Sequence, residues 1–181
     1  MQDLIQKIEQ WAEDRNIIKG SKPIDQAMKL FSEFGELADN VAKGCCIKDD
    51  IGDVFVVLTI MAKQTNLSMF DALNFSGIGV GSLKHGVAGL SWCLSDFVND
   101  PRKLSLMEAL EALDAICYEA KVKLEECVQI AYNDIKDRTG VMYNGVFIKS
   151  TDAAYQDALD NIEADKRIAT QKRISVDIQD I

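Results

Sequence analysis

Several residue types are scarce in this chain, and their scarcity narrows the possible folds. Among the 181 residues there are two prolines, Pro23 and Pro101, and a single histidine, His85. Proline interrupts helices, so its scarcity, together with the few alternating β-branched runs, favours an all-α fold. The five cysteines show no C-x-x-C spacing and have one histidine to join them, which argues against a zinc site. We expect these cysteines to be reduced thiols.

The sequence also lacks a basic stripe and a long apolar run. Its formal net charge is −9, and no cluster of Lys and Arg stands out to neutralise a phosphate backbone, so we expect no nucleic-acid partner. The longest apolar run, Val54–Ala62, is too short to span a bilayer. The first fifteen residues lack the apolar core of a signal peptide. We therefore expect a cytoplasmic protein with no membrane partner.

Helical periodicity begins at the N-terminus. A first helix is predicted over residues 3–15 from one apolar stripe, formed by Leu4, Ile8 and Trp11. Residues 16–22 are expected to form a loop. Pro23 suits a first helical turn and Gly44 suits a C-terminal stop, so a second helix is predicted from Pro23 to Lys43.

A third helix is predicted from Asp49 and Asp50, which can cap it, to about Gln64. Its residues are apolar nearly all round, which indicates burial on most sides. Ser68 is expected to cap a short fourth helix that reaches about Phe75. The glycine-rich segment 76–82 lacks the G-x-G-x-x-G spacing and a preceding strand, so we interpret it as a connector rather than a phosphate loop.

Residues 76–136 have two open interpretations, an insertion or a degenerate repeat of the first half. Helical patterns run from Val87 to Asn99 and from Leu106 to about Lys136. If Leu37 is aligned with Leu94, Glu33 and Glu36 of the first half correspond to Leu90 and Cys93.

The C-terminal part contains a hairpin signal followed by a polar extension. Asn144-Gly145 stands between two apolar pairs, and both residues tolerate the positive φ of a tight turn, so 137–150 is predicted to form a β-hairpin. Residues 151–181 are expected to be helical or flexible, with one helix suggested by Tyr155, Leu159 and Ile162. We assign no chemistry to this extension.

Two pairs of acidic residues form the most informative pattern. Glu33 and Glu36 are three positions apart, as are Asp50 and Asp53, and residues at this spacing share one helix face roughly 5–6 Å apart. The short loop containing Gly44 makes the two helices neighbours, so four carboxylates are expected to face one volume. Such a concentration of negative charge requires a cation, which predicts a magnesium site. The alternative is that Glu33 and Glu36 lie on a solvated helix face, and that Asp50 and Asp53 are first-turn residues that stabilise a helix N-terminus.

The acidic pattern resembles the MazG-type all-α nucleoside triphosphate pyrophosphohydrolases, whose signature is Glu-x-x-Glu, a spacer and Glu-x-x-Asp. The resemblance covers residues 1–70 and 131–150, and it extends to Trp11, Arg15, Gln26 and Lys29 upstream. The segment AYNDIKDRTGVMYNGVFIKS resembles the C-terminal part of compact, phage-type members. Two positions depart from the family pattern: Ser32 replaces a common glutamate, and Asp50 replaces a longer glutamate.

The resemblance implies an antiparallel helical bundle over residues 1–150, with a catalytic half at 1–75. It also implies Mg²⁺-dependent cleavage of a (d)NTP between the α and β phosphates, which yields a (d)NMP and pyrophosphate, with Mn²⁺ as a substitute metal. The implied metal ligands and catalytic residues are Glu33, Glu36, Asp50 and Asp53. One of these, or Asp49, would accept the proton of the attacking water. Relatives with a single module dimerise, so a homodimer is expected. If residues 76–136 are a degenerate repeat, the resemblance implies that one chain forms an intramolecular pseudo-dimer with one active site.

Further residues are candidates for binding the substrate. Lys29 either contacts a phosphate or pairs with Glu33 one turn away. Trp11 either stacks on the base or belongs to the core. The remaining candidates are Gln26 and, as weaker phosphate ligands, Lys48, Lys136 and Arg138.

Two rival functions remain open at this point. Within the enzyme class, the substrate is more specific, such as dUTP or phosphoribosyl-ATP. Outside it, the chain is a helical binding or assembly protein that has kept the bundle but lost turnover, an interpretation motivated by Ser32, Asp50 and the unmatched middle.

Overall fold

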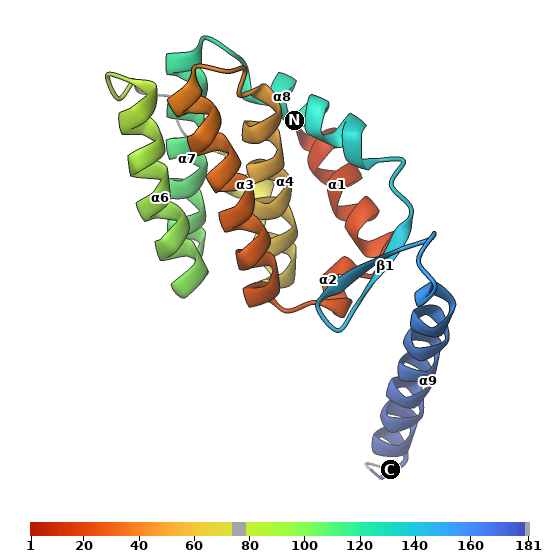
Figure 1. Cartoon of the computed structure of the whole chain (residues 1–181). Helices are drawn as coiled ribbons and strands as arrows, with labels where there is room; N and C mark the ends of the chain where they lie inside the picture. Colours follow the sequence, from red (N-terminus) through yellow and green to blue (C-terminus); the bar gives the residue numbers. More distant parts are fainter. Residues whose placement is uncertain (74–78, 180–181) are drawn as a thin grey trace.

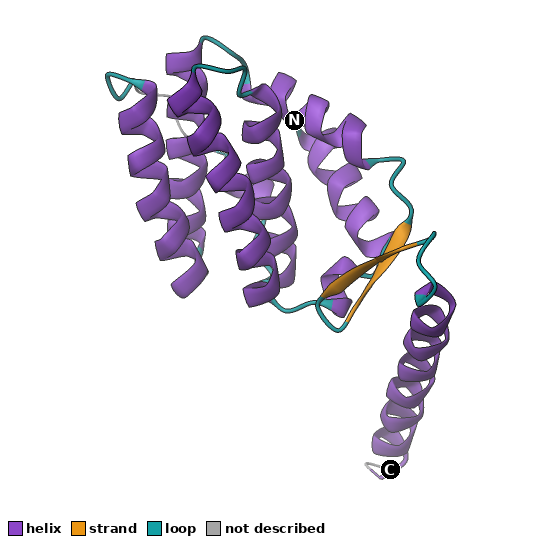
Figure 2. Ribbon diagram, in the orientation of Figure 1, coloured by secondary structure: helices purple, strands orange, loops and turns teal. Residues whose placement is uncertain are grey.

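The computed structural model describes residues 1–73 and 79–179, with side chains described up to residue 171. Helices form a bundle, a small hairpin covers one end of it, and a last helix extends away from that end (Figures 1 and 2). The elements are α1 (Gln2–Asp14), α2 (Ile17–Gly20), α3 (Pro23–Lys43), α4 (Lys48–Gln64), α5 (Met69–Ala72), α6 (Leu83–Asn99), α7 (Lys103–Ala120), α8 (Leu124–Ile135), β1 (Gly140–Tyr143), β2 (Val146–Lys149) and α9 (Tyr155–Gln179). The prediction of a mostly helical chain with one hairpin is confirmed. None of the described helices is both long and apolar enough to cross a membrane.

Helices α3 and α4 form an antiparallel pair joined by a short loop. α3 begins at Pro23 and stops at Gly44, whose φ of +71° is the left-handed conformation that closes a helix. Both ends of this helix were predicted correctly. α4 begins earlier than expected, after Ile47, so the prediction that Asp49 or Asp50 caps it is wrong. Both aspartates lie inside the first turn, where the helix dipole favours negative charge.

α4 is the central helix of the bundle. It packs against α1, α3, α7 and α8, and residues on every side of it are buried, which confirms the prediction from its apolar sequence. Gly52 permits α4 to lie close to α8, because a Cβ at this position would lie 2.3 Å from the carbonyl oxygen of Cys127 in α8. The core is therefore organised around α4.

A second helical pair, α6 and α7, lies beside α3 (Figure 1). Leu90, the residue aligned with Glu33 in the repeat interpretation, is fully buried in this pair. The helical pattern predicted from Leu106 to about Lys136 is divided between two helices, α7 and α8. Lys121 adopts a φ of +57° and ends α7, and α8 begins after Lys123. That this part is a degenerate copy of the first half stays a prediction.

Two shorter segments also differ from the sequence prediction. The expected loop at 16–22 contains the short helix α2. Ser68 caps α5 as predicted, by accepting a hydrogen bond from the backbone N–H of Asp71, but this helix ends at Ala72. Positions 74–75 of the expected helix, and 76–78 of the expected connector, lie outside the described residues.

The predicted β-hairpin is confirmed. Asn144 and Gly145 adopt φ values of +49° and +79°, and the strands pair so that Met142 faces Phe147 and Val141 faces Ile148. Beyond the hairpin, α9 is a long helix rather than a flexible tail, and its first half packs on β1 and β2.

Candidate functional site

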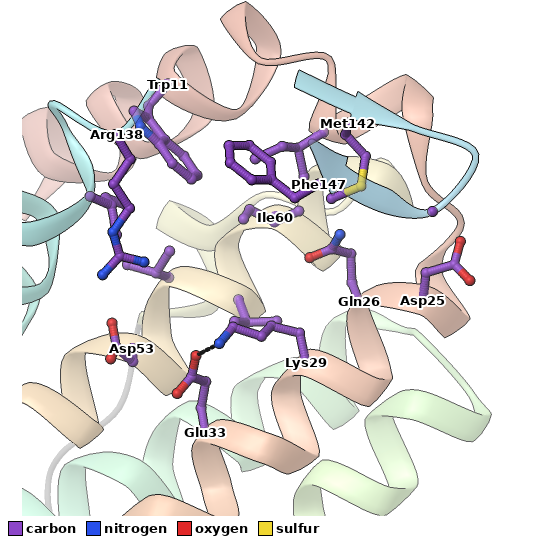
Figure 3. Close-up of a pocket in the computed structure, with 15 residues that line it drawn as sticks. Trp11, Asp25, Gln26, Lys29, Glu33, Asp53, Ile60, Arg138, Met142 and Phe147 are labelled. Atoms are coloured by element: carbon purple, nitrogen blue, oxygen red, sulfur yellow. Dashed lines mark ion pairs between the residues drawn. The ribbon is translucent and has the colours of Figure 1, made fainter. Parts of the chain in front are cut away.

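A pocket of about 380 Å³ lies between α1, α2, α3, α4, the end of α8 and the hairpin. Figure 3 shows charged side chains toward one end and apolar side chains toward the other. The lining residues are Trp11, Ile17, Asp25, Gln26, Lys29, Glu33, Asp53, Val56, Val57, Ile60, Ile135, Arg138, Met142, Gly145 and Phe147. Six of the ten predicted site residues are therefore gathered around one cavity.

The charged end of the pocket combines two carboxylates and two cations. Glu33 is 6% exposed and forms an ion pair with Lys29, one turn earlier on α3. Asp53 faces them from α4, and the guanidinium of Arg138 points toward this aspartate (Figure 3). Of the two roles considered for Lys29, the pairing with Glu33 is the one formed here. Lys29 still lines the cavity, so its cation remains available to the same space.

Asp53 is electrostatically perturbed. Its pKa is raised to about 7, first by burial and then by the neighbouring carboxylates of Glu33 and Asp49, whereas Lys29 and Arg138 oppose the rise. Burial is also the main cause of the raised pKa of Asp49, assisted by Asp134 and Asp50. Asp53 can consequently exchange a proton near neutral pH.

The apolar end of the pocket is made by Trp11, Ile60, Met142 and Phe147, with the Gln26 amide between the two ends (Figure 3). Trp11 is partly buried, and the guanidinium of Arg15 lies 5.0 Å from its ring centroid. Its indole N–H is buried and has no hydrogen-bond partner among the described residues. The tryptophan is thus both packed against the core and exposed to the cavity.

Hydrogen bonds from α1 and α2 fix the far wall of the pocket. Arg15 Nε donates to the carbonyl oxygen of Arg138 at 2.7 Å, and the backbone N–H of Met142 donates to the carbonyl oxygen of Arg15 at 2.8 Å. The N–H of Gly145 donates to the carbonyl oxygen of Gly20 at 2.8 Å. A Cβ at Gly20 would lie 2.2 Å from the Met142 carbonyl oxygen, so only glycine permits this approach. Arg15 therefore positions Arg138 and Trp11 together.

The other four predicted residues do not line this pocket. Glu36 is exposed on α3. Asp50 is 8% exposed and accepts two hydrogen bonds from the Asn40 amide. Lys48 pairs with Glu126 at 2.6 Å, and Lys136 contacts Asn133 at 3.4 Å. The structure thus brings together Glu33 and Asp53, but not all four carboxylates.

The donor set fits a magnesium ion in part. Glu33 and Asp53 supply the carboxylate oxygens that Mg²⁺ prefers, and the pKa of Asp53 is raised by its burial and by the neighbouring carboxylates. However, among residues 1–73 and 79–179 no three His, Cys, Asp or Glu side chains are grouped closely enough to hold a metal ion. Glu33 and Asp53 could begin such a site.

Sequence reasoning missed the contribution of the hairpin. Met142 and Phe147 line the pocket, yet neither was a candidate. A signal was present, because a two-residue Asn-Gly turn fixes the strand register and makes these two residues cross-strand partners on one face. The register alone does not predict which face of the hairpin packs on the bundle.

No family model matches the chain, and no solved structure matches it. The chain is similar to an uncharacterized 18.2 kDa protein of Haemophilus phage HP1 (strain HP1c1), described as lying in the rep-hol intergenic region. The two are 55% identical over 69 residues, which is 37% of this chain and 42% of the phage protein. The match therefore spans less than half of either protein, and it relates part of this chain to a phage protein.

Proposed function

We propose that the protein is a Mg²⁺-dependent nucleoside triphosphate pyrophosphohydrolase of the MazG-like type. The observation that supports this proposal is the division of the pocket into two ends. A nucleotide also has two ends, a planar base and a polyphosphate, and the pocket offers aromatic surface to one and carboxylates with cations to the other. The acidic signature that resembles this family lies partly in the same pocket, through Glu33 and Asp53.

Each residue has a role that follows from its chemistry. Lys29 and Arg138 would neutralise phosphate oxygens, and Trp11 with Phe147 would contact the base. Bound Mg²⁺, held by Glu33 and Asp53, would polarise the phosphoryl group and lower the pKa of a water. One of the four implied ligands, or Asp49, would accept the proton of the attacking water. The resemblance also assigns Glu36 and Asp50 to the ligand set, although neither lines the pocket in this structure.

A second candidate is a binding or assembly protein without turnover. Two observations favour it: Glu36 is exposed outside the pocket, and Asp50 is already engaged by Asn40. Such a protein would use the same pocket for a nucleotide but would not hydrolyse it.

Pyrophosphate release separates the two candidates. The wild-type protein is incubated with Mg²⁺ and a panel of dNTPs and NTPs, together with dUTP and phosphoribosyl-ATP. We expect release from at least one substrate, and a loss of at least about 100-fold in Asp53→Asn and Glu33→Gln. Asp39→Asn is the matched control, because Asp39 is an exposed carboxylate of α3 that pairs with Lys43 away from the pocket lining.

The result that overturns the enzyme assignment is absence of release from every nucleotide. Release that survives in both pocket variants would also overturn it. Binding of a nucleotide without release would support the second candidate.

A further inference from the structure

The β-hairpin has two faces that contact different parts of the protein. Met142 and Phe147, which are cross-strand partners, line the pocket. Val141 and Ile148, the next pair, belong to a separate apolar cluster with α9. Successive residues of a strand point to opposite faces, so the pocket wall and the α9 contact are two sides of the same ladder.

α9 contributes a small and specific contact to this cluster. Ala158 is 2% exposed and Ile162 is 8% exposed, and both are buried with Val141. Further along the same helix, Ile168 is 51% exposed. Figure 1 shows α9 extending from the hairpin away from the bundle. The apolar contacts described for α9 lie in its first half, against the back of the pocket wall.

The two strands are held unequally on the pocket side. On β1, the backbone N–H of Met142 donates to the carbonyl oxygen of Arg15. The carbonyl oxygen of Met142 accepts from the Asn16 side-chain amide at 2.9 Å. β2, which carries Phe147, pairs only with β1 within its sheet. A hairpin of two strands is marginally stable by itself, so the position of Phe147 depends on packing from both faces.

We propose that α9 is a positioning element for the apolar end of the pocket. Through Ala158 and Ile162 it holds Val141 and Ile148, and thereby keeps Met142 and Phe147 against Trp11. Because these side chains would contact the base, α9 sets the affinity for the organic part of the nucleotide and leaves the charged end unchanged. The identity of the ligand rests on the proposed function, whereas the positioning of the wall does not.

The test uses the full-length chain with Trp92→Phe. Trp92 is 79% exposed, and the chain has two tryptophans, so Trp11 becomes the only reporter. Ile162→Ala is compared with Ile168→Ala, the same substitution at an exposed site of the same helix, and with the conservative Ile162→Val. Helical circular dichroism and the thermal midpoint show whether each variant keeps its bundle. The readouts are acrylamide quenching of Trp11 and the kinetics on whichever nucleotide is hydrolysed.

We expect Ile162→Ala to increase the quenching constant of Trp11 about twofold or more and to raise KM about 3–10-fold, with kcat changed less than about twofold. Ile168→Ala should match the parent protein, and Ile162→Val should lie close to it. If the wild type hydrolyses no nucleotide, the proposed function fails, and the quenching comparison still decides the positioning role. Quenching in Ile162→Ala equal to that in Ile168→Ala would overturn the proposal, as would a loss confined to kcat.

Discussion

The side-chain amide of Asn40 donates to both carboxylate oxygens of Asp50, at 3.0 and 2.9 Å, and so links α3 to α4. Asp50 is nearly buried, and a buried carboxylate needs such donors. The contact gives Asp50 a structural role that is independent of any metal. If Asp50 also binds a cation, that cation must share this carboxylate with Asn40.

Replacing Asn40 tests the structural role of this contact. Asn40→Ala leaves the Asp50 carboxylate without its donor, so we expect a loss of about 1–3 kcal/mol in the free energy of unfolding. The measurement is urea unfolding followed by circular dichroism. Asp39→Ala, on the exposed side of the same helix, should change stability by less than about 0.5 kcal/mol. Equal effects of the two substitutions would contradict a structural role for the Asn40 contact.

Two glycines in the acidic helices should respond oppositely to alanine. Gly52→Ala places a Cβ against the Cys127 carbonyl oxygen, where 2.3 Å is available, so we expect a loss of about 1–3 kcal/mol or more. Gly35→Ala meets no atom within 4 Å on the exposed side of α3, so higher helix propensity should stabilise the protein by about 0.5–1 kcal/mol. Thermal unfolding measures both. A stabilised Gly52→Ala protein would show that α4 and α8 are not in close contact.

The pKa of Asp53 predicts a pH dependence of stability in the metal-free protein. Its folded pKa of about 7 lies above the value of 3.8 for an ordinary aspartate, so the folded state retains a proton that the unfolded state loses. Stability should therefore fall as pH rises from about 4 to about 7 and then level off. Because Asp53 is only partly buried, solvent screening reduces the expected fall to about 1–2 kcal/mol.

Asp53→Asn serves as the comparison for that pH series. The variant should lack this fall, so its stability relative to wild type should improve between pH 4 and pH 8. The measurement is urea unfolding with chelator present at each pH. Parallel stability curves for the two proteins would exclude the predicted shift of the Asp53 pKa.

Metal binding should stabilise the folded protein through the same carboxylates. At a Mg²⁺ concentration ten times its Kd, the stabilisation should be about 1.4 kcal/mol, and a chelator should reverse it. Glu33→Gln and Asp53→Asn should lose this response, whereas Asp39→Asn should keep it. Differential scanning calorimetry with and without Mg²⁺ gives the result. Equal stabilisation of Asp53→Asn and wild type would place the ion elsewhere.

Local signals in the sequence were sufficient to predict much of the fold. The limits of α3 follow from Pro23 and Gly44, and the hairpin turn follows from Asn144-Gly145, because each depends on the backbone preferences of one or two residues. The break at Lys121 was not predicted, because no residue there has such a backbone preference. A lysine with positive φ carries no such signal.

The candidate site was predictable only in part. Helical spacing correctly placed Glu33 near Asp53, since both depend on the α3–α4 pair. It did not separate the buried Glu33 from the exposed Glu36, because the rotation of α3 is set by distant contacts with α4 and α6. The apolar end depends on the docking of the hairpin onto α1 and α2. No pattern within one segment could show that contact.

The pocket joins the beginning of the chain to a hairpin near its other end, since Trp11 and Phe147 line the same cavity. During synthesis, domains fold as their residues emerge from the ribosome, and contacts between distant residues form late. Glu33, Lys29 and Asp53 of the charged end can come together from α3 and α4 before Arg138 and β2 have been translated. A nascent chain would therefore acquire its carboxylates first and become able to enclose a ligand only when the hairpin arrives.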